Sequence, residues 1–153
     1  MTELHKFADG PQDQYLLIPE QGNALVISTE EVRAKGVNHT GFRFPMYNVR
    51  GYERPPQPGE SRSQWVEATR PQSNLTDRSG IEPVFMTYPD VKVAPPLRDE
   101  GDINKALGIV GTAYINLQQD PTATLNIAAD FRDAGVPFEQ LTVELTTFRP
   151  PQA

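Results

Sequence analysis

The sequence predicts a mainly β protein, namely an antiparallel β-sandwich or open barrel with one or two short helices and a long irregular excursion rich in proline and arginine. Three observations support this fold class. Apolar and polar residues alternate with a period of two in three consecutive segments near the C-terminus. Two apolar segments near the N-terminus are separated by a glycine-containing loop, as in a β-hairpin. The 15 prolines and 11 glycines divide the apolar residues into short bursts, which suit strands better than helices.

Length and composition limit the class of protein. A chain of 153 residues fits a single β-rich domain, 1–153, that is long enough to bury a core. The formal net charge of −6 does not favour a polyanionic partner, and the lack of cysteine excludes disulfides and thiolate chemistry. No apolar run could span a bilayer, and the first residues lack the apolar core of a signal peptide. We therefore expect no membrane partner, no secretion by a signal peptide and a cytoplasmic origin.

The first zone, residues 1–41, predicts a hairpin followed by a short helix. The segments QYLLIP and NALVIST flank EQG, which is typical of two strands joined by a short loop. Ser28 and Glu31 then stand at the spacing of a capping box, and Gly36 is placed to end a helix. One or two helical turns are expected over residues 28–36.

The second zone, residues 42–80, is the excursion, for which an extended arm or loop is expected. It holds six of the ten arginines and no lysine. Its formal charge is +2, whereas the remainder of the chain carries −8. A short strand around Trp65–Val66 is the only regular element that the pattern predicts inside it.

The third zone, residues 81–153, carries the most regular pattern. Short strands are expected on either side of Pro89, and a short helix from an N-cap at Asp102 to Gly108. Residues 109–149 then predict a three-stranded antiparallel meander built from IVGTAYINL, ATLNIAADF and LTVELTTF. The residues expected to face the core are Ile109, Ala113, Ile115, Leu117, Ala123, Leu125, Ile127, Ala129, Phe131, Leu141, Val143 and Leu145.

The sequence predicts no catalytic residue, no metal site and no cofactor. The two histidines, His5 and His39, are not spaced for zinc binding in a chain without cysteine. The acidic cluster Asp99–Asp102 lacks the spacing of an EF-hand loop, so a place at a helix N-terminus, where acids interact favourably with the dipole, is expected instead. We therefore expect a protein that is not an enzyme.

The excursion has three interpretations: a disordered linker, a strap for nucleic acid, or an arm that docks on another protein. Arginine with aromatic residues suits single-stranded nucleic acid, but a local charge of only +2 beside an acidic remainder disfavours that partner. Arginine, tyrosine and tryptophan are also enriched at protein interfaces, and proline lowers the entropy lost when an extended segment docks. A protein partner is therefore expected, with packing inside the chain as the alternative. The interface candidates are Arg43, Tyr47, Arg50, Tyr52, Arg54, Trp65 and Arg70.

The segment RFPMYNVRGYERPPQPGESRSQW, together with the C-terminal meander, resembles the accessory structural proteins of tailed-phage virions, such as capsid decoration or cement proteins and small tail components. The resemblance implies a non-enzymatic structural protein of the virion that forms a homo-oligomer. It also implies a major capsid protein, or another structural subunit, as partner. The alternatives are a cellular β-sandwich adaptor that binds a protein ligand and, third, a small enzyme without a recognisable motif.

Overall fold

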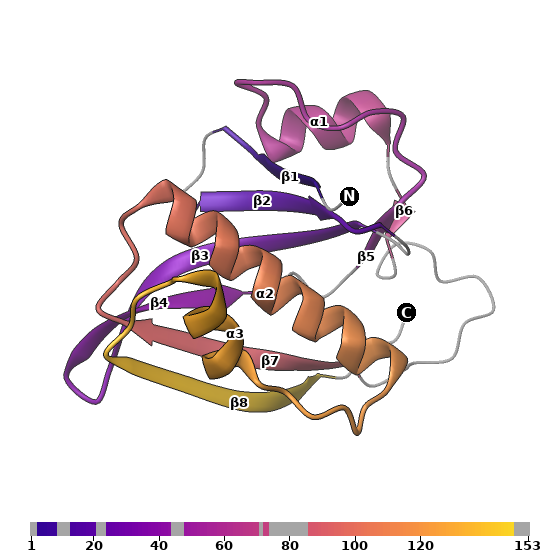
Figure 1. The fold of residues 1–153 in the computed structure, drawn as a ribbon. Helices are drawn as coiled ribbons and strands as arrows, with labels where there is room; N and C mark the ends of the chain where they lie inside the picture. Colours follow the sequence, from indigo (N-terminus) through magenta and orange to yellow (C-terminus); the bar gives the residue numbers. More distant parts are fainter. Residues whose placement is uncertain are drawn as a thin grey trace. The chain divides into compact units, whose positions relative to one another are not determined.

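The protein is built on a mainly antiparallel, open β-sheet with three helices, which confirms the predicted fold class (Figure 1). The computed structural model describes residues 3–8, 13–20, 24–43, 48–70, 72–73 and 86–148. Its strands are β1 (Glu3–Lys6), β2 (Asp13–Ile18), β3 (Ala24–Ala34), β4 (Val37–Arg43), β5 (Asn48–Arg50), β6 (Gln72–Ser73), β7 (Met86–Ala94) and β8 (Gln140–Phe148). Its helices are α1 (Arg62–Thr69), α2 (Glu100–Gln119) and α3 (Ile127–Ala134). The strand order is β1-β2-β3-β4-β7-β8, with β5 beside β3 and β6 beside β5.

Close contacts divide the chain into two compact units, where the sequence predicts one domain. Among the described residues, unit 1 comprises those up to Ser28 and those of 48–73. Unit 2 comprises Thr29–Arg43 and Met86–Phe148. Strand β3 is divided between them, since its first five residues belong to unit 1 and the rest to unit 2.

Unit 1 combines a small sheet with helix α1. Strands β1 and β2 pair antiparallel from Glu3 opposite Ile18 onward, and β2 lies beside β3, as the predicted hairpin requires. The strand expected around Trp65–Val66 is wrong, because these residues lie in α1. A capping box begins this helix: Ser61 Oγ accepts from the backbone N–H of Gln64, and the Gln64 side chain accepts from the backbone N–H of Ser61.

Unit 2 begins with a β-hairpin where the sequence predicts helical turns, so the prediction over residues 28–36 is wrong. Strand β3 continues to Ala34, and β4 starts at Val37. The two residues between them, Lys35 and Gly36, have φ values of 53° and 78°. Positive φ at both central positions is the geometry of a type I′ turn, which matches the twist of a hairpin. Gly36 therefore forms a turn between strands and does not end a helix.

Strand β7 runs without a break through Pro89, where two shorter strands are expected. It pairs with β8 over nine residues, from Met86 opposite Phe148 to Ala94 opposite Gln140. The register of β4 covers only Val91–Val93 of β7. Pro89 therefore lies beyond the β4 pairing, where a missing backbone N–H breaks no bond to that strand.

The predicted meander over residues 109–149 is wrong in its first two strands. Residues 100–119 form α2 and residues 127–134 form α3, so the described part of the chain has three helices, one of them long, where one or two short helices are expected. The buried side chains of α2 recur at intervals of three and four residues, which is the helical period. They are Ala106, Leu107, Val110, Ala113, Tyr114 and Leu117.

Helix α2 also begins and ends at other residues than expected. Its N-cap is Asp99, whose Oδ1 accepts from the backbone N–H of Gly101 at 2.8 Å and of Asp102 at 3.2 Å. The helix passes through Gly108 and ends at Gln119. The acidic cluster thus lies at a helix N-terminus, as expected, although Asp102 is not the cap.

Helix α2 packs against β7 and α3, and both helices lie on the same face of the unit 2 sheet (Figure 1). Burial of Val91 and Val93 shows which face of β7 is covered. Within the described part of the chain, no helix is both long and apolar enough to cross a lipid bilayer.

Replacing Asp99 with alanine is expected to lower the free energy of unfolding by about 1 kcal/mol, because the first turn of α2 loses its side-chain cap. Asp102→Ala is the matched control, since it removes the same charge from the same turn but only a dipole interaction. Urea denaturation followed by circular dichroism measures both. A larger loss for Asp102→Ala would contradict the assignment of the cap.

Candidate interaction surfaces

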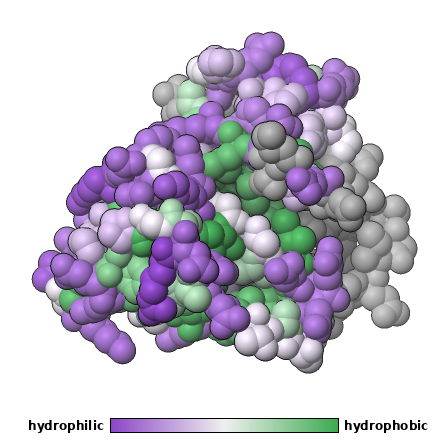
Figure 2. Space-filling model, viewed as in Figure 1, coloured by the Kyte–Doolittle hydropathy of each residue, from purple (hydrophilic) through white to green (hydrophobic). Residues whose placement is uncertain are grey.

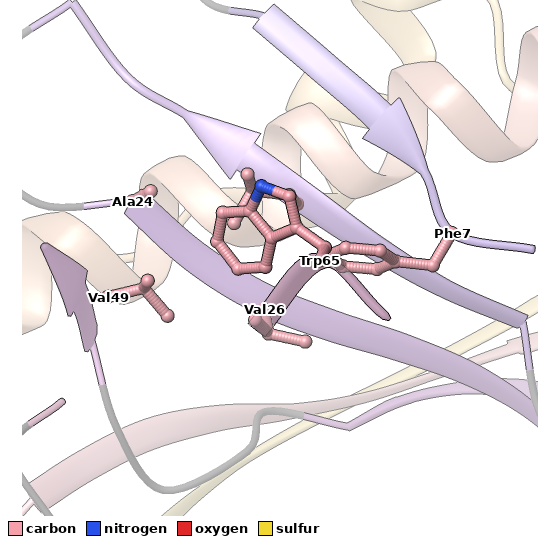
Figure 3. Packing of buried hydrophobic residues seen from close by; sticks show 6 residues of the cluster. Phe7, Ala24, Val26, Val49 and Trp65 are labelled. Atoms are coloured by element: carbon pink, nitrogen blue, oxygen red, sulfur yellow. The ribbon is translucent and has the colours of Figure 1, made fainter. Parts of the chain in front are cut away.

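Trp65 lies at the centre of the hydrophobic core of unit 1. Its side chain is fully buried, with an exposed fraction of 0%, and packs with Phe7, Ala24, Val26 and Val49 (Figure 3). The ring centroids of Phe7 and Trp65 lie 5.5 Å apart. For Trp65 the structure therefore supports the alternative interpretation, packing inside the chain. A side chain with no exposed surface can stabilise only its own unit.

The polar atom of the indole is satisfied inside the excursion itself. Trp65 Nε1 donates to the backbone carbonyl of Arg54 at 2.9 Å. Ala8 donates from its backbone N–H to the carbonyl of Glu60 at 2.8 Å, which ties the segment before α1 to the residues after β1. Much of the predicted arm is thus a folded part of unit 1.

Arg54 and Glu60 close the proline-rich loop between them with a bidentate ion pair. Arg54 Nη1 lies 2.7 Å from Glu60 Oε1, and Nη2 lies 2.8 Å from Oε2. The backbone N–H of Gln57 donates to Glu60 Oε1 at 3.0 Å, and Arg54 Nη1 also donates to the carbonyl of Pro55 at 3.1 Å. This planar, two-bond geometry is the stronger form of an arginine–carboxylate pair.

These bonds change the acidity of Glu60. The hydrogen bond from Arg54 lowers the pKa of the Glu60 carboxyl from 4.5 to about 2, and the backbone bond from Gln57 acts in the same direction. Burial opposes both effects. The charged form of Glu60 is therefore the form that the folded loop stabilises.

The remaining candidates lie on different elements. Tyr52 is half-buried, with its ring centroid 5.7 Å from that of Trp65. Arg43 belongs to unit 2, where its exposed guanidinium stands 3.9 Å from Glu30 Oε2. Arg70 is exposed in the left-handed conformation that ends α1, with φ of 47°.

The other two candidates are described in part or not at all. Arg50 lies in β5 opposite Gln72, and its backbone alone is described. Tyr47 lies outside the described residues. The structure thus brings together Tyr52, Arg54 and Trp65 in unit 1, where Trp65 is fully buried and the other two are half-buried.

A different surface, on strand β8, carries exposed apolar side chains. Among the described residues, the exposed large hydrophobic side chains are Val66, Val143 and Leu145, and the last two lie on β8. The exposed fractions are 37% for Val143 and 56% for Leu145. The expectation that these residues face a covered core is therefore wrong, although LTVELTTF is a strand as predicted.

The apolar side of β8 continues the covered face of the sheet. Residues directly opposite one another in an antiparallel pair point to the same face. Phe42 on β4 stands opposite Val91 on β7, which stands opposite Val143 on β8. The exposed fraction is 4% for Phe42, 0% for Val91 and 37% for Val143, so this face of the sheet is buried on β4 and β7 but exposed on β8. Figure 2 shows hydrophobic surface among hydrophilic side chains where Figure 1 places α3, β7 and β8.

Strand β8 also ends the strand order, so the described part of the chain pairs it on one side only. Edge strands are usually protected from pairing by lysine, proline, bulges or short length. Nine residues long, β8 contains neither lysine nor proline and carries one charge, that of Glu144. It has the features of an edge that can accept another strand.

A shallow cavity of about 400 Å³ lies at the C-terminal end of α3. Its lining residues are Arg132, Gly135, Val136, Pro137 and Phe138. The guanidinium of Arg132 stands 5.7 Å from the centre of the Phe138 ring, where it is held by cation–π attraction. The lining thus offers one cation and no carboxylate or histidine.

Neither histidine is among the residues that line this cavity. His39 is buried in β4, with Nδ1 3.0 Å from the carbonyl of Val37, and His5 lies in β1 with Nε2 3.8 Å from Glu3 Oε1. Within the described ranges, no three histidine, aspartate or glutamate side chains gather where they could hold a metal ion.

The interface candidates that the sequence predicts do not include three residues of these surfaces: Glu60, Val143 and Leu145. Glu60 could have been found from its opposite charge to Arg54 across a loop of prolines and Gly59, which favours a closed turn. Val143 and Leu145 were placed in the core because alternation gives the faces of a strand but not what covers them.

Trp65→Ala is expected to lower the free energy of unfolding by about 3 to 5 kcal/mol, because it removes a fully buried aromatic side chain. Val66→Ala, one position along the same helix and exposed, is the control and should change it by no more than about 0.5 kcal/mol. Chemical denaturation gives both values. A Trp65→Ala protein as stable as wild type would show that the indole is not part of the core.

The stability that Glu60 contributes is expected to depend on pH. Its pKa is lower in the folded state, so the contribution is fully present above a pH of about 4.5 and is lost as the pH falls toward about 2. Glu60→Gln should remove this component from the slope of unfolding free energy against pH. Glu67→Gln, at an exposed site on α1, is the charge-matched control and should retain it. The ion pair would be disproved as a source of stability if Glu60→Gln kept the wild-type slope.

The fold and these surfaces were compared with known proteins. No protein-family model and no curated protein matches the sequence, and no solved structure matches the fold. The chemistry of the chain's own surfaces is therefore what indicates its function.

Proposed function

We propose that the protein is a non-enzymatic structural subunit that works by assembling with other protein chains, copies of itself included. The observation that carries this proposal is the exposed apolar side of edge strand β8. Val143 and Leu145 leave hydrophobic surface beside unpaired strand positions, and such surface is typical of interfaces. Backbone pairing at a sheet edge gives affinity, and side chains on alternate positions give specificity.

The folded loop of unit 1 supports a structural role in a different way. Arg54, Glu60 and Trp65 hold the excursion in one conformation through a bidentate ion pair and a buried ring. A segment fixed in this manner loses little entropy when it contacts a partner. The exposed Arg70, at the end of α1, offers a cation at the border of that segment.

The specific form that we propose is a decoration or cement protein of a virion, bound to a major capsid protein or to another structural subunit. Its support is the resemblance of residues 43–65 to such proteins. The expected C-terminal meander, on which the resemblance also rested, gives no support, because helices α2 and α3 stand in place of its first two strands. A cellular adaptor that accepts a strand from a protein ligand would use the same edge of β8. The two roles differ in whether the chain forms a defined homo-oligomer alone.

Native mass spectrometry and sedimentation velocity between about 10 and 500 µM test the assembly, in the range where contacts of micromolar affinity are populated. A defined homo-oligomer is the expected result. A chain that stays monomeric throughout would contradict self-assembly and favour the adaptor. Genes for capsid or portal proteins beside the gene of this chain are expected for the virion role, and their absence would count against it.

A further inference from the structure

We propose that two copies of the chain pair antiparallel through their β8 strands, edge to edge, about a two-fold axis at Val143. The inference rests on the proposed function and names the contact that begins assembly. A two-fold axis perpendicular to a sheet places a strand beside an antiparallel copy of itself, with the same face upward in both. The two sheets then become one continuous sheet across the contact.

The register follows from the sequence of β8. An axis at Val143 sets Val143 opposite its own copy and Leu141 opposite Leu145 of the second copy. All three apolar residues on this side of the strand thus meet apolar residues. Moving the axis by one residue to Thr142 sets Glu139 opposite Leu145 of the second copy, and moving it to Glu144 sets Leu141 opposite Thr147. Only the axis at Val143 pairs the whole apolar row.

Charge selects the same register. Glu144 is the only charged residue of β8, and the axis at Val143 places it opposite Thr142 of the second copy. An axis at Glu144 would place the two carboxylates opposite each other, which is unfavourable. On its own chain Glu144 already stands opposite Asp90, whose Oδ2 lies 2.9 Å from Lys92 Nζ. A second acid opposite Glu144 would add to this negative charge.

Pairing would complete the partly covered face of the sheet. The row of Phe42, Val91 and Val143 is buried on β4 and β7 and becomes exposed on β8. In the pair, each Val143 gains the Val143 of the other copy as its cross-strand neighbour. The apolar face then continues from one copy into the next. In a single copy this face ends at β8, where it is exposed to solvent.

A second copy of β8 suits this edge better than β1, the strand at the other end of the strand order. Strand β1 has the sequence ELHK, so it offers Leu4 alone as an apolar side chain. Pairing of β1 with β8 would set Glu3, His5 or Lys6 against the apolar row. The isologous pair of β8 strands matches three apolar positions and makes a closed dimer.

Val143→Glu tests the contact, because it places two carboxylates opposite each other on the axis. The wild-type chain is expected to form dimers in sedimentation equilibrium, and the variant should raise the dimer dissociation constant by about 100-fold. Thr124→Glu adds the same charge at an exposed loop position of unit 2 and should leave the constant unchanged. Thermal unfolding of each variant checks that the single chain still folds.

Single cysteines test the register, since the native chain has none to compete. Val143→Cys should form a disulfide-linked dimer under mild oxidation, because the axis brings the two positions face to face at about 5 Å between Cβ atoms. Thr142→Cys, one residue away, should not, since each Thr142 stands opposite Glu144 of the other copy. The double variant Thr142→Cys, Glu144→Cys should form the link again.

Each result decides the proposal. Dimers weakened by Val143→Glu and linked by Val143→Cys support it. A wild-type oligomer that Val143→Glu does not weaken would overturn the β8 pair while leaving assembly, and so the proposed function, in place. A wild-type chain that is monomeric up to about 500 µM would overturn both the pair and self-assembly, and binding of a foreign protein at β8 would then be the remaining use of the edge.

Discussion

Unit 1 depends on the burial of one indole ring. Trp65 is the largest of its fully buried side chains, and it contacts residues from the end of β1, from β3 and from β5. Its Nε1 is bonded to the carbonyl of Arg54, so burying the ring leaves no polar atom unsatisfied. Because the ring can be buried only when α1 lies against the sheet, the loop before α1 is fixed as well. The ion pair of Arg54 with Glu60 then joins the two ends of that loop, just before α1.

This arrangement explains why composition alone does not separate an interface from a core. Arginine, tyrosine and tryptophan are enriched at interfaces because they combine apolar area with polar groups, and the same property suits them to a small core. In unit 1 the ring of Tyr52 packs on Trp65, and Arg54 binds the carboxylate of Glu60, six residues along the chain. Residue type therefore predicted that these side chains make important contacts, but not whether the contacts lie within the chain or between chains.

The sequence carried enough information for the fold class and for the strands with a clear boundary. The sequence predicts β2 from an apolar run beside a glycine-containing loop and β8 from apolar alternation, and both are strands. Residues 28–36 were misassigned because Gly36 can end a helix or form a type I′ turn, and the choice depends on pairing between β3 and β4. Residues 109–117 fit period two and period 3.6 about equally. Only the buried positions Val110 and Tyr114, four residues apart, separate the two patterns.

Two predictions fail for the same reason: that residues 109–134 form strands, and that Val143 and Leu145 of β8 face a covered core. If those residues had been strands, β8 would have been the last strand of a meander, with neighbours of its own kind to share a covered face. As helices, α2 packs against β7 and α3 packs against α2, and neither contributes a strand beside β8. Strand β8 keeps the alternation of a half-buried strand, yet Val143 and Leu145 remain exposed in the part of the chain that the structure describes. The alternation that β8 retains at this edge of the described sheet is the feature on which the proposed pairing with a second copy rests.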